Sequence, residues 1–243
     1  MRPASTNPLP GRSRLPQLLL ATLCALGALT AGSAAAQVAP SARQAAAYTG
    51  LHGAAHKGDT AALEKLIAAR ADLHARDAYG RTAVHVAAFA RKRDALRTLA
   101  KAGAQLELLE NDRYDAVTIA AVADDEETLR VLLGLGASAK LITSRYDGTA
   151  LIAAAHLGHD GVVKQLIVAG APLDHVNNLH WTAVIEVIVL GDGGSRHQEA
   201  LRALLAVGAS TRLTDRQGNS PLTLAKARGY QAMVQLLESA GAK

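Results

Sequence analysis

Residues 77–88 read Asp77-Ala78-Tyr79-Gly80-Arg81-Thr82-Ala83-Val84-His85-Val86-Ala87-Ala88, and near-copies of this stretch fill most of the chain. Aligned on the Thr-x-x-His pattern, at spacings of 33, 33, 34, 33 and 38 residues, the copies place their threonine position at Thr49, Thr82, Asp115, Thr149, Thr182 and Ser220. A later Gly-Ala pair gives a second alignment, with its glycine position at Arg70, Gly103, Gly136, Gly170, Gly208 and Gly241. Because two independent alignments agree on six copies, the chain is predicted to be built of structural repeats.

The recurring residues suit a turn followed by a helix. Asp77 and Gly80 occupy the first and fourth positions of a four-residue stretch, and Gly218 ends the same pattern in the last copy; this pattern favours a type I turn. Thr82 then stands at the expected N-cap of a helix, where its hydroxyl can accept a hydrogen bond from a free backbone N–H. In the last copy Pro221 follows the cap position, where the N–H that proline lacks would have no partner in the helix.

The glycine that closes each copy indicates how its second helix ends. Many helices end at a residue with left-handed backbone, which glycine adopts without a steric penalty. Arg70 occupies this position in the first copy, so we expect a local cost of ~1 kcal/mol there relative to glycine. Each copy is therefore predicted to hold two helices, the second one with a left-handed cap.

The period and the residues resemble the ankyrin repeat, which reads roughly Asp-x-x-Gly-x-Thr-Pro-Leu-His-x-Ala-Ala. The resemblance covers about residues 44–243, although the histidine position is kept only at His52 and His85. It implies an all-α solenoid of about six helix-turn-helix repeats, joined by short turns or β-hairpin fingers. It also implies that His52 and His85 tie the turns of adjacent repeats together. The expected repeats are residues 44–76, 77–109, 110–142, 143–176, 177–214 and 215–243.

The first 36 residues have the pattern of a secretory signal peptide. Arg2, Arg12 and Arg14 precede an apolar run from Leu18 to Ala31, and residues 34–36 form an Ala-x-Ala cleavage site. We expect cleavage before Gln37, a linker over residues 37–43, and a periplasmic or alternatively secreted bacterial protein that is not inserted in the membrane after cleavage. A retained membrane anchor is the alternative, although the run is shorter than the about 20 apolar residues that a spanning helix needs.

Removal of the signal peptide changes the charge and the redox chemistry of the chain. Three arginines leave with it and no acidic residue does, so the net charge falls from +5 to +2. No clustered basic stripe remains, which disfavours a nucleic-acid-binding protein. The single cysteine, Cys24, also leaves. The mature chain can form no disulfide, so the stacking of helices must supply its stability.

The candidates for catalysis and metal binding are weak. Nine histidines are present, but none pairs with another in a His-x-x-x-His pattern, and the chain has no cysteine pair that could hold zinc. The sequence also lacks Gly-x-Ser-x-Gly and any other recognisable nucleophile arrangement. The acidic run over residues 124–127 suits the start of a helix, where acids meet the positive end of its dipole. We therefore expect no enzyme activity, no cofactor and no metal.

The fifth copy differs from the others by an insertion. Residues 191–197, Gly-Asp-Gly-Gly-Ser-Arg-His, lengthen the connection between its two helices by five residues. A glycine-rich loop can hold phosphate, but this one follows no strand and is not followed by Lys-Ser or Lys-Thr. It is predicted to be a surface insertion that the fold tolerates.

The variable positions of the repeats are the candidates for partner binding. In the family that the chain resembles, partners contact the turn tips and the two positions after the Ala-Ala pair. Five of the seven aromatic residues lie beside the turns, and aromatic residues and arginine are common anchors of interfaces. The candidate residues are Tyr79, Phe89, Arg113, Tyr114, Val122, Tyr146, His156, Leu157, Trp181, Val189 and Leu190. An alternative is that some of these aromatic residues only cover the backbone of their turns.

These observations predict a non-catalytic binding protein. The expected function is that of a scaffold or accessory factor in the bacterial periplasm, monomeric by itself, that binds another protein. The alternative from a different class is a hydrolase or a metal-binding protein built on the solenoid, which the missing catalytic residues disfavour.

Overall fold

The structure is a computed structural model that describes residues 39–242. It confirms the all-helical repeat architecture: this part of the chain holds thirteen helices and no strand, with one isolated antiparallel bridge between Thr143 and Gly148. None of these helices is long and apolar enough to cross a membrane. The predicted signal peptide, residues 1–36, lies outside the described residues, as do the first two residues of the predicted linker.

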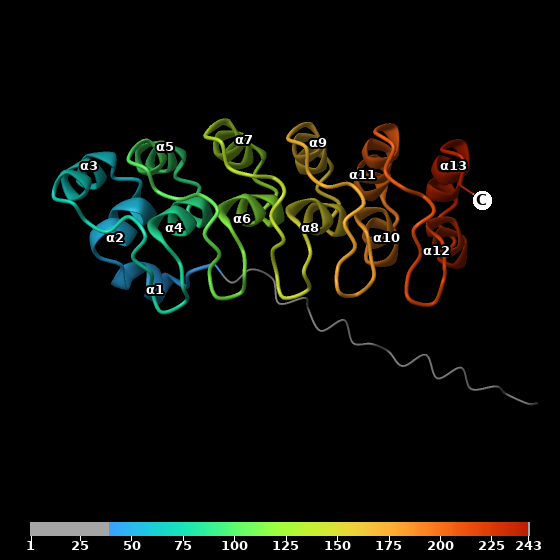
Figure 1. Ribbon diagram of the computed structural model, residues 1–243, viewed down its shortest axis with the longest axis horizontal. Coiled ribbons are helices and arrows are strands. Elements are labelled where there is room, and N and C mark those ends of the chain that lie inside the picture. The colour runs from blue at the N-terminus through green and yellow to red at the C-terminus, as the bar shows by residue number, and fades with distance from the viewer. Residues whose placement is uncertain (1–38, 243) are drawn as a thin grey trace, which may run out of the picture. The chain divides into compact units, whose positions relative to one another are not determined.

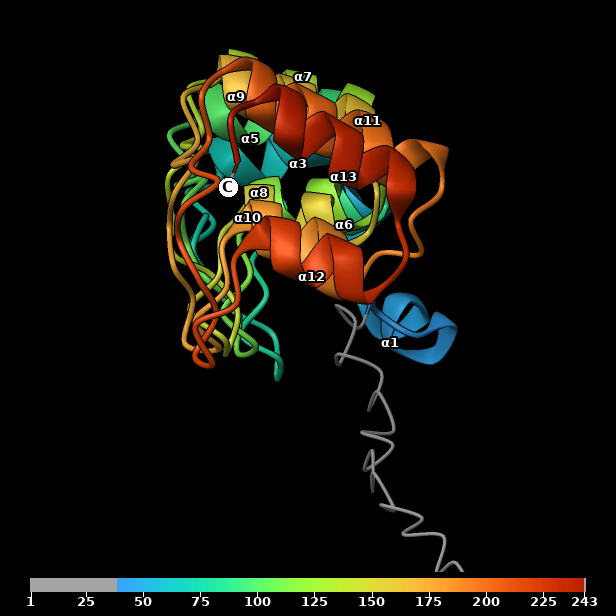
Figure 2. The same cartoon turned by 90° about the vertical axis from the view of Figure 1, so that its right-hand side faces the viewer.

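The helices form two rows (Figure 1). The inner row, next to the turns, is α2 (Gly50–Lys57), α4 (Ala83–Phe89), α6 (Ala116–Val122), α8 (Ala150–His156), α10 (Ala183–Val189) and α12 (Pro221–Ala227). The outer row is α3 (Thr60–Ala68), α5 (Arg93–Lys101), α7 (Glu126–Gly134), α9 (Asp160–Val168), α11 (Ser195–Ala206) and α13 (Gln231–Ser239). Figure 2 shows each row end-on, with the hairpin turns projecting together to one side. One inner and one outer helix make one repeat.

Each inner helix begins at the residue by which the repeats were aligned. Thr49, Thr82, Asp115, Thr149, Thr182 and Ser220 are the N-cap residues of the six inner helices. The Asp115 carboxylate, for example, accepts a hydrogen bond from the Thr118 N–H at 2.9 Å. Each outer helix ends at a residue with left-handed backbone. These residues are Gly103, Gly136, Gly170, Gly208 and Gly241, and in the first repeat Arg70, with φ 58°. The recurring residues thus mark where the helices begin and end.

The turns between repeats form five fingers, numbered after the repeat that each precedes. Their first residues are Asp77, Glu110, Ser144, Asn177 and Asp215, and each side chain accepts backbone N–H groups from the second and fourth residues that follow it. The sequence pattern predicts this turn only at fingers 2 and 6, which begin at Asp77 and Asp215. The other three form because glutamate, serine and asparagine supply the same acceptor oxygen that aspartate does.

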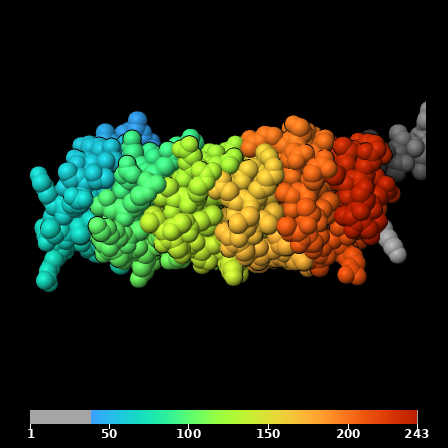
Figure 3. All heavy atoms as spheres, turned by 90° about the horizontal axis from the view of Figure 1, so that it is seen from above, coloured from blue at the N-terminus to red at the C-terminus, as the bar shows by residue number. Residues whose placement is uncertain are grey.

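Alanine and leucine fill the space between the two rows. The Ala-Ala pairs of the central inner helices are almost completely buried, as are the outer-helix leucines Leu96, Leu129 and Leu166. Burying one leucine stabilises the fold by about 1.5–3 kcal/mol, and the small alanines let the inner helices approach one another. Figure 3 shows the repeats following one another in chain order without mixing. The core therefore runs through all six repeats as one cluster.

The first repeat has a helix where the others have a finger. α1 (Ala42–Ala47) is capped by Ser41 and packs against α2. It begins within the segment predicted as a linker, because Ser41 and Gln44 form a capping box that starts a helix there. Tyr48 follows it, and its hydroxyl donates to the Asp77 carboxylate at 2.8 Å. This contact connects the first repeat to finger 2.

Candidate functional site

The histidines at the repeat's own histidine position connect neighbouring repeats. His52 Nε2 lies 2.8 Å from the Arg81 carbonyl oxygen, and His85 Nε2 lies 3.2 Å from that of Tyr114. The other nitrogen of His85 faces the backbone N–H and the hydroxyl of Thr82. Burial lowers the pKa of His85 to about 4, so this ring is neutral at physiological pH and serves the fold.

The predicted apolar residues lie at the C-terminal ends of the inner helices. Phe89, Val122 and Val189 are the last residues of α4, α6 and α10, and each is half-buried. Leu157 and Leu190 cap α8 and α10 and are 40% and 42% exposed. Each of repeats two to five therefore carries an apolar side chain at the last residue or at the C-cap of its inner helix.

The predicted aromatic residues lie on the fingers. Tyr79 and Tyr146 are exposed, whereas Tyr114 and Trp181 are half-buried. Phe89 and Tyr114 pack against the buried core; Trp181 is not among the residues that do so. Tyr114 thus contributes to the packing of the fold.

Arg81 brings the finger residues and the helix residues together in the second repeat. Its guanidinium carbon lies 4.6 Å from the centre of the Tyr79 ring and 5.5 Å from that of Phe89. The side chain is almost completely buried and pairs with Asp77 at 3.8 Å. The sequence pattern gave no sign of this buried arginine. Its contacts bring one residue of each predicted set, Tyr79 and Phe89, to the same side of the second repeat. We call the predicted finger and inner-helix residues together the finger-side strip: Tyr79, Phe89, Tyr114, Val122, Tyr146, Leu157, Trp181, Val189 and Leu190.

Three central finger tips have left-handed backbone without glycine. The position that Gly80 and Gly218 occupy is taken by Arg113 (φ 67°), Asp147 (φ 52°) and His180 (φ 69°). Such a residue costs roughly 1–2 kcal/mol relative to glycine. Arg113 pairs with Asp147 of the next finger at 3.2 Å. The predicted binding residue Arg113 therefore contributes a charged side chain and an inter-finger ion pair.

His156, the remaining predicted residue, lies beside a buried carboxyl group that the sequence analysis missed. Its Nδ1 is 3.6 Å from Glu186 Oε2, and Glu186 Oε1 accepts a hydrogen bond from the Asn177 amide at 2.7 Å. Glu186 is 5% exposed, and burial raises its pKa to about 7. Burial lowers the pKa of His156, and the nearby His197 and His159 lower it further. Near pH 7 the His156 ring is therefore mainly neutral, and about half of the Glu186 carboxyl groups keep their proton.

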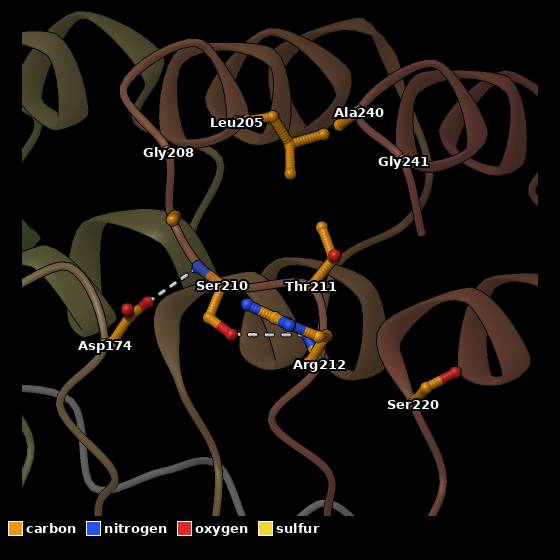
Figure 4. A pocket seen from close by; sticks show the side chains of 10 residues that line it. Asp174, Leu205, Gly208, Ser210, Thr211, Arg212, Ser220, Ala240 and Gly241 are labelled. Atoms are coloured by element: carbon orange, nitrogen blue, oxygen red, sulfur yellow. Dashed lines mark hydrogen bonds between the residues drawn. The ribbon is translucent and has the colours of Figure 1, made fainter. Parts of the chain in front are cut away.

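Two hollows of the described surface lie away from the finger-side strip. One, of about 700 Å³, lies between the ends of α11 and α13, and Asp174, Ser210 and Arg212 are among the residues that line it (Figure 4). The Ser210 N–H donates to Asp174 there, at 2.8 Å. The other, of about 480 Å³, lies between α7 and α9 beside Val168. In the first hollow Asp174 is thus bonded to the backbone of Ser210.

Metal ligands do not gather in the part of the chain that the structure describes. Within residues 39–242 no group of three or more His, Cys, Asp or Glu side chains could hold a metal ion. The histidines have other neighbours: His159 Nδ1 is 2.9 Å from the Ala121 carbonyl oxygen, and His175 Nε2 is 2.6 Å from that of Asp147. Both of these rings thus lie within hydrogen-bond distance of the backbone.

Known proteins share this arrangement of caps, fingers and paired helices. The family described as ankyrin repeats (3 copies) matches residues 51–143 and 150–243. The chain belongs to the ankyrin-repeat family. An ankyrin repeat domain from Acinetobacter baumannii has 40% identical residues and superposes with a TM-score of 0.75, over 79% of this chain and 98% of that one. The ankyrin repeat protein YahD of Escherichia coli K12 is 41% identical over 100 residues.

The extent of these ankyrin likenesses differs. The match to YahD covers 41% of this chain and 50% of YahD, so the chain spans about half the length of that relative. A chain from the complex of the endopeptidase Bd0816 with the immunity protein Bd3460 of Bdellovibrio bacteriovorus superposes with a TM-score of 0.66 at 24% identity, over 79% of this chain and 98% of that one. At that identity the likeness is one of fold.

Proposed function

We propose that this ankyrin-repeat protein binds another protein through the finger-side strip and works as a non-catalytic scaffold or accessory factor in the bacterial periplasm. The observation that carries the proposal is the strip itself, where exposed Tyr79, Tyr146, Leu157 and Leu190 lie on the side of the fingers and inner-helix ends. Apolar side chains gathered on a soluble surface commonly mark a partner site. Ankyrin repeats are typically protein-binding scaffolds, which supports the same function.

The composition of the strip fits a protein partner better than a small molecule. Small ligands are usually held in enclosed clefts, and two hollows of the described surface, between α11 and α13 and between α7 and α9, lie away from the strip. The strip extends over four repeats, from Tyr79 in the second to Leu190 in the fifth, and carries tyrosine and tryptophan. Such residues often anchor protein interfaces.

The binding test compares the strip with an equally apolar site away from it. Residues 37–243 would be used as bait in periplasmic extract of the source bacterium, as wild type, as Trp181→Ala with Leu190→Ala, and as Val168→Ala. Val168 is 88% exposed on the outer row and serves as the control. We expect the double variant to weaken capture of the partner by ~2 kcal/mol or more, about 30-fold, while the control binds as the wild type does.

Two outcomes would contradict the binding proposal. Equal capture by wild type and the double variant, with equal melting temperatures, would exclude the strip as the contact surface. A large loss of melting temperature in Trp181→Ala alone would instead indicate that Trp181 packs beneath its own finger. Hydrolysis of model substrates by the mature protein, or bound metal, would favour the alternative of an enzyme or metal protein.

The periplasmic location is tested separately. The pattern of residues 1–36 supports export and cleavage, so the N-terminal residue of the protein isolated from the periplasm is expected to be Gln37. Recovery of a chain that still begins at Met1 in the membrane fraction would contradict this location and favour a retained anchor.

A further inference from the structure

A buried carboxyl group occupies an unusual place beneath finger 5. The equivalent positions of the other five inner helices hold Gly53, Val86, Ile119, Ala153 and Leu224, none of which carries a polar side chain. In α10 the position holds Glu186, which is 5% exposed. A buried charge is costly unless several hydrogen bonds satisfy it, and this carboxyl group receives one, from the Asn177 amide at 2.7 Å. Its neutral, protonated form therefore suits the folded structure.

Asn177 connects this carboxyl group directly to the backbone of finger 5. Its side-chain oxygen accepts the N–H groups of Leu179 and Trp181, both at 3.0 Å, and its own N–H donates to the Trp181 carbonyl at 3.0 Å. Its side-chain nitrogen donates to Glu186. The Asn177 side chain thus bonds both to the backbone of finger 5, which carries Trp181, and to the buried carboxyl group. A change in the ionisation of Glu186 is therefore expected to affect the conformation of finger 5.

The other groups around Glu186 offer no fixed positive charge. From α8, His156 faces it at 3.6 Å, and the His156 carbonyl oxygen lies 3.0 Å from Nε2 of His197 on α11. In α12, Lys226 pairs with Glu238 of α13 at 3.0 Å. In finger 5 itself, His180 stands next to Trp181 and is exposed. Glu186 is the one charged residue of α10. Loss of its proton would therefore leave a poorly compensated charge.

We propose that Glu186, Asn177 and His156 form a proton-controlled latch that holds finger 5 in place and so regulates partner binding at the finger-side strip. The regulatory half rests on the proposed function; the latch itself does not. With the proton present, Asn177 bonds both Glu186 and the finger. When the proton leaves, the Asn177 hydrogen bond stabilises the carboxylate only in part, because burial still disfavours the charge. In this proposal finger 5 then loosens and lets water reach the carboxylate.

The direction of the pH effect follows from the buried groups. Burial raises the pKa of Glu186 from 4.5 to about 7. Its contribution to stability is therefore complete below about pH 4.5 and is lost as pH rises through about 7. His156 acts in the opposite sense, because burial lowers its pKa below 6.5, so stability falls when pH drops and this ring must be charged. The closed finger is thus expected to loosen as the pH rises past neutrality.

Trp181 provides a direct signal for the latch, because it is the one tryptophan of the chain. Its fluorescence would be followed between pH 5 and pH 9 on the mature protein, with far-ultraviolet circular dichroism to confirm that the helices stay folded. The wild type is expected to show a one-proton transition with a midpoint near pH 7. Glu186→Gln, which imitates the protonated form, is expected to abolish it. Glu186→Leu, with a residue found at equivalent positions, is the second variant in case the first does not fold.

Two controls separate the latch from other titrating groups. Glu107→Gln changes an exposed glutamate outside finger 5 and should leave the transition in place. His180→Gln removes the imidazole next to Trp181 and should also leave it. Persistence of the transition in both Glu186 variants, or its loss in His180→Gln alone, would overturn the proposal.

Measurement of the partner's affinity at pH 6 and pH 8 tests whether the latch regulates binding. Since a midpoint near 7 leaves about nine-tenths of the protein competent at pH 6 and about a tenth at pH 8, the partner's affinity should fall about tenfold between them. In Glu186→Gln the affinity should stay at its pH 6 value. A partner that binds the wild type equally at both pH values would contradict regulation but not the proposed function. A fluorescence transition without any strip-dependent partner would support the latch while contradicting the proposed function.

Discussion

Left-handed backbone at single residues shows where this chain departs from the ideal repeat. Arg70, Arg113, Asp147 and His180 adopt positive φ at places where other repeats have glycine. Residues in such conformations tend to gather at functional sites, where a side chain is needed in spite of the strain. Arg113, Asp147 and His180 lie on three consecutive fingers, on the side proposed to bind a partner. Arg70 lies at the end of α3, away from the fingers.

The different settings of these residues lead to a stability prediction. Arg70 is exposed, so Arg70→Gly should remove the strain without losing a buried contact and raise the free energy of unfolding by about 0.5–1 kcal/mol. Urea denaturation would measure it. Arg70→Ala, which keeps the strain and removes the same side chain, is the control and should give no gain. Equal stabilisation by both variants would show that the strained backbone is not the cause.

The sequence predicts the single residues that recur in the repeats but not those that occur in one repeat alone. The N-cap residues and glycine caps recur at a fixed period, so alignment of the copies was enough to find them. Arg81 and Glu186 do not recur; they lie at positions that are usually uncharged in the other copies. Their burial depends on how a finger folds back over an inner helix, which composition and spacing do not determine.

The insertion in the fifth repeat contacts residues of the third and fourth repeats. It lengthens α11 to 12 residues, against nine in the other outer helices. His197 packs over Gly158, where an added Cβ would lie 2.8 Å from the ring. Arg196 pairs with Asp124 at 2.8 Å and with Asp160 at 3.2 Å, and so reaches two repeats back. The prediction of a surface insertion placed it on the outside but could not find these contacts, because they join residues far apart in the sequence.

Removal of the Arg196 side chain should weaken the attachment of the fifth repeat. Because the arginine is half-exposed, we expect Arg196→Met to lower the free energy of unfolding by only about 1 kcal/mol. The ion pair with Arg196 lowers the pKa of Asp124, so this contribution is present at neutral pH and is lost as pH falls below the ordinary pKa of aspartate, 3.8. Denaturation at pH 7 and pH 3 would measure the difference.

Arg202→Met is the matched control for this change. Arg202 lies on the same helix, and within residues 39–242 its ion-pair partner is Glu199, one turn away, at 3.2 Å. If the two variants lose equal stability at pH 7, the contacts of Arg196 with the third and fourth repeats contribute nothing measurable.

For the whole molecule, the period of the sequence predicted the order and number of the repeats, because each repeat buries its apolar face against the next. The proposed partner-binding side was predicted only as two sets of side chains. Sequence spacing could not relate the two sets, because the contact of Tyr79 and Phe89 with Arg81 depends on how a finger folds over an inner helix. The position of residues 1–36 lies outside the described part, and the export prediction stays a prediction.

The finger-to-finger backbone bonds have a consequence for the protection of amide hydrogens from exchange with solvent. The N–H groups of Asn111, Ser144 and Asn178 each donate to the preceding finger, at 3.0, 2.9 and 2.9 Å. In the described residues no such bond reaches finger 6, which is joined to Asn178 through the Arg216 side chain. These three amides should therefore exchange with deuterium slowly although they lie in surface turns, and the Arg216 amide should exchange fast. Equal exchange at all four would mean that the fingers open independently of one another.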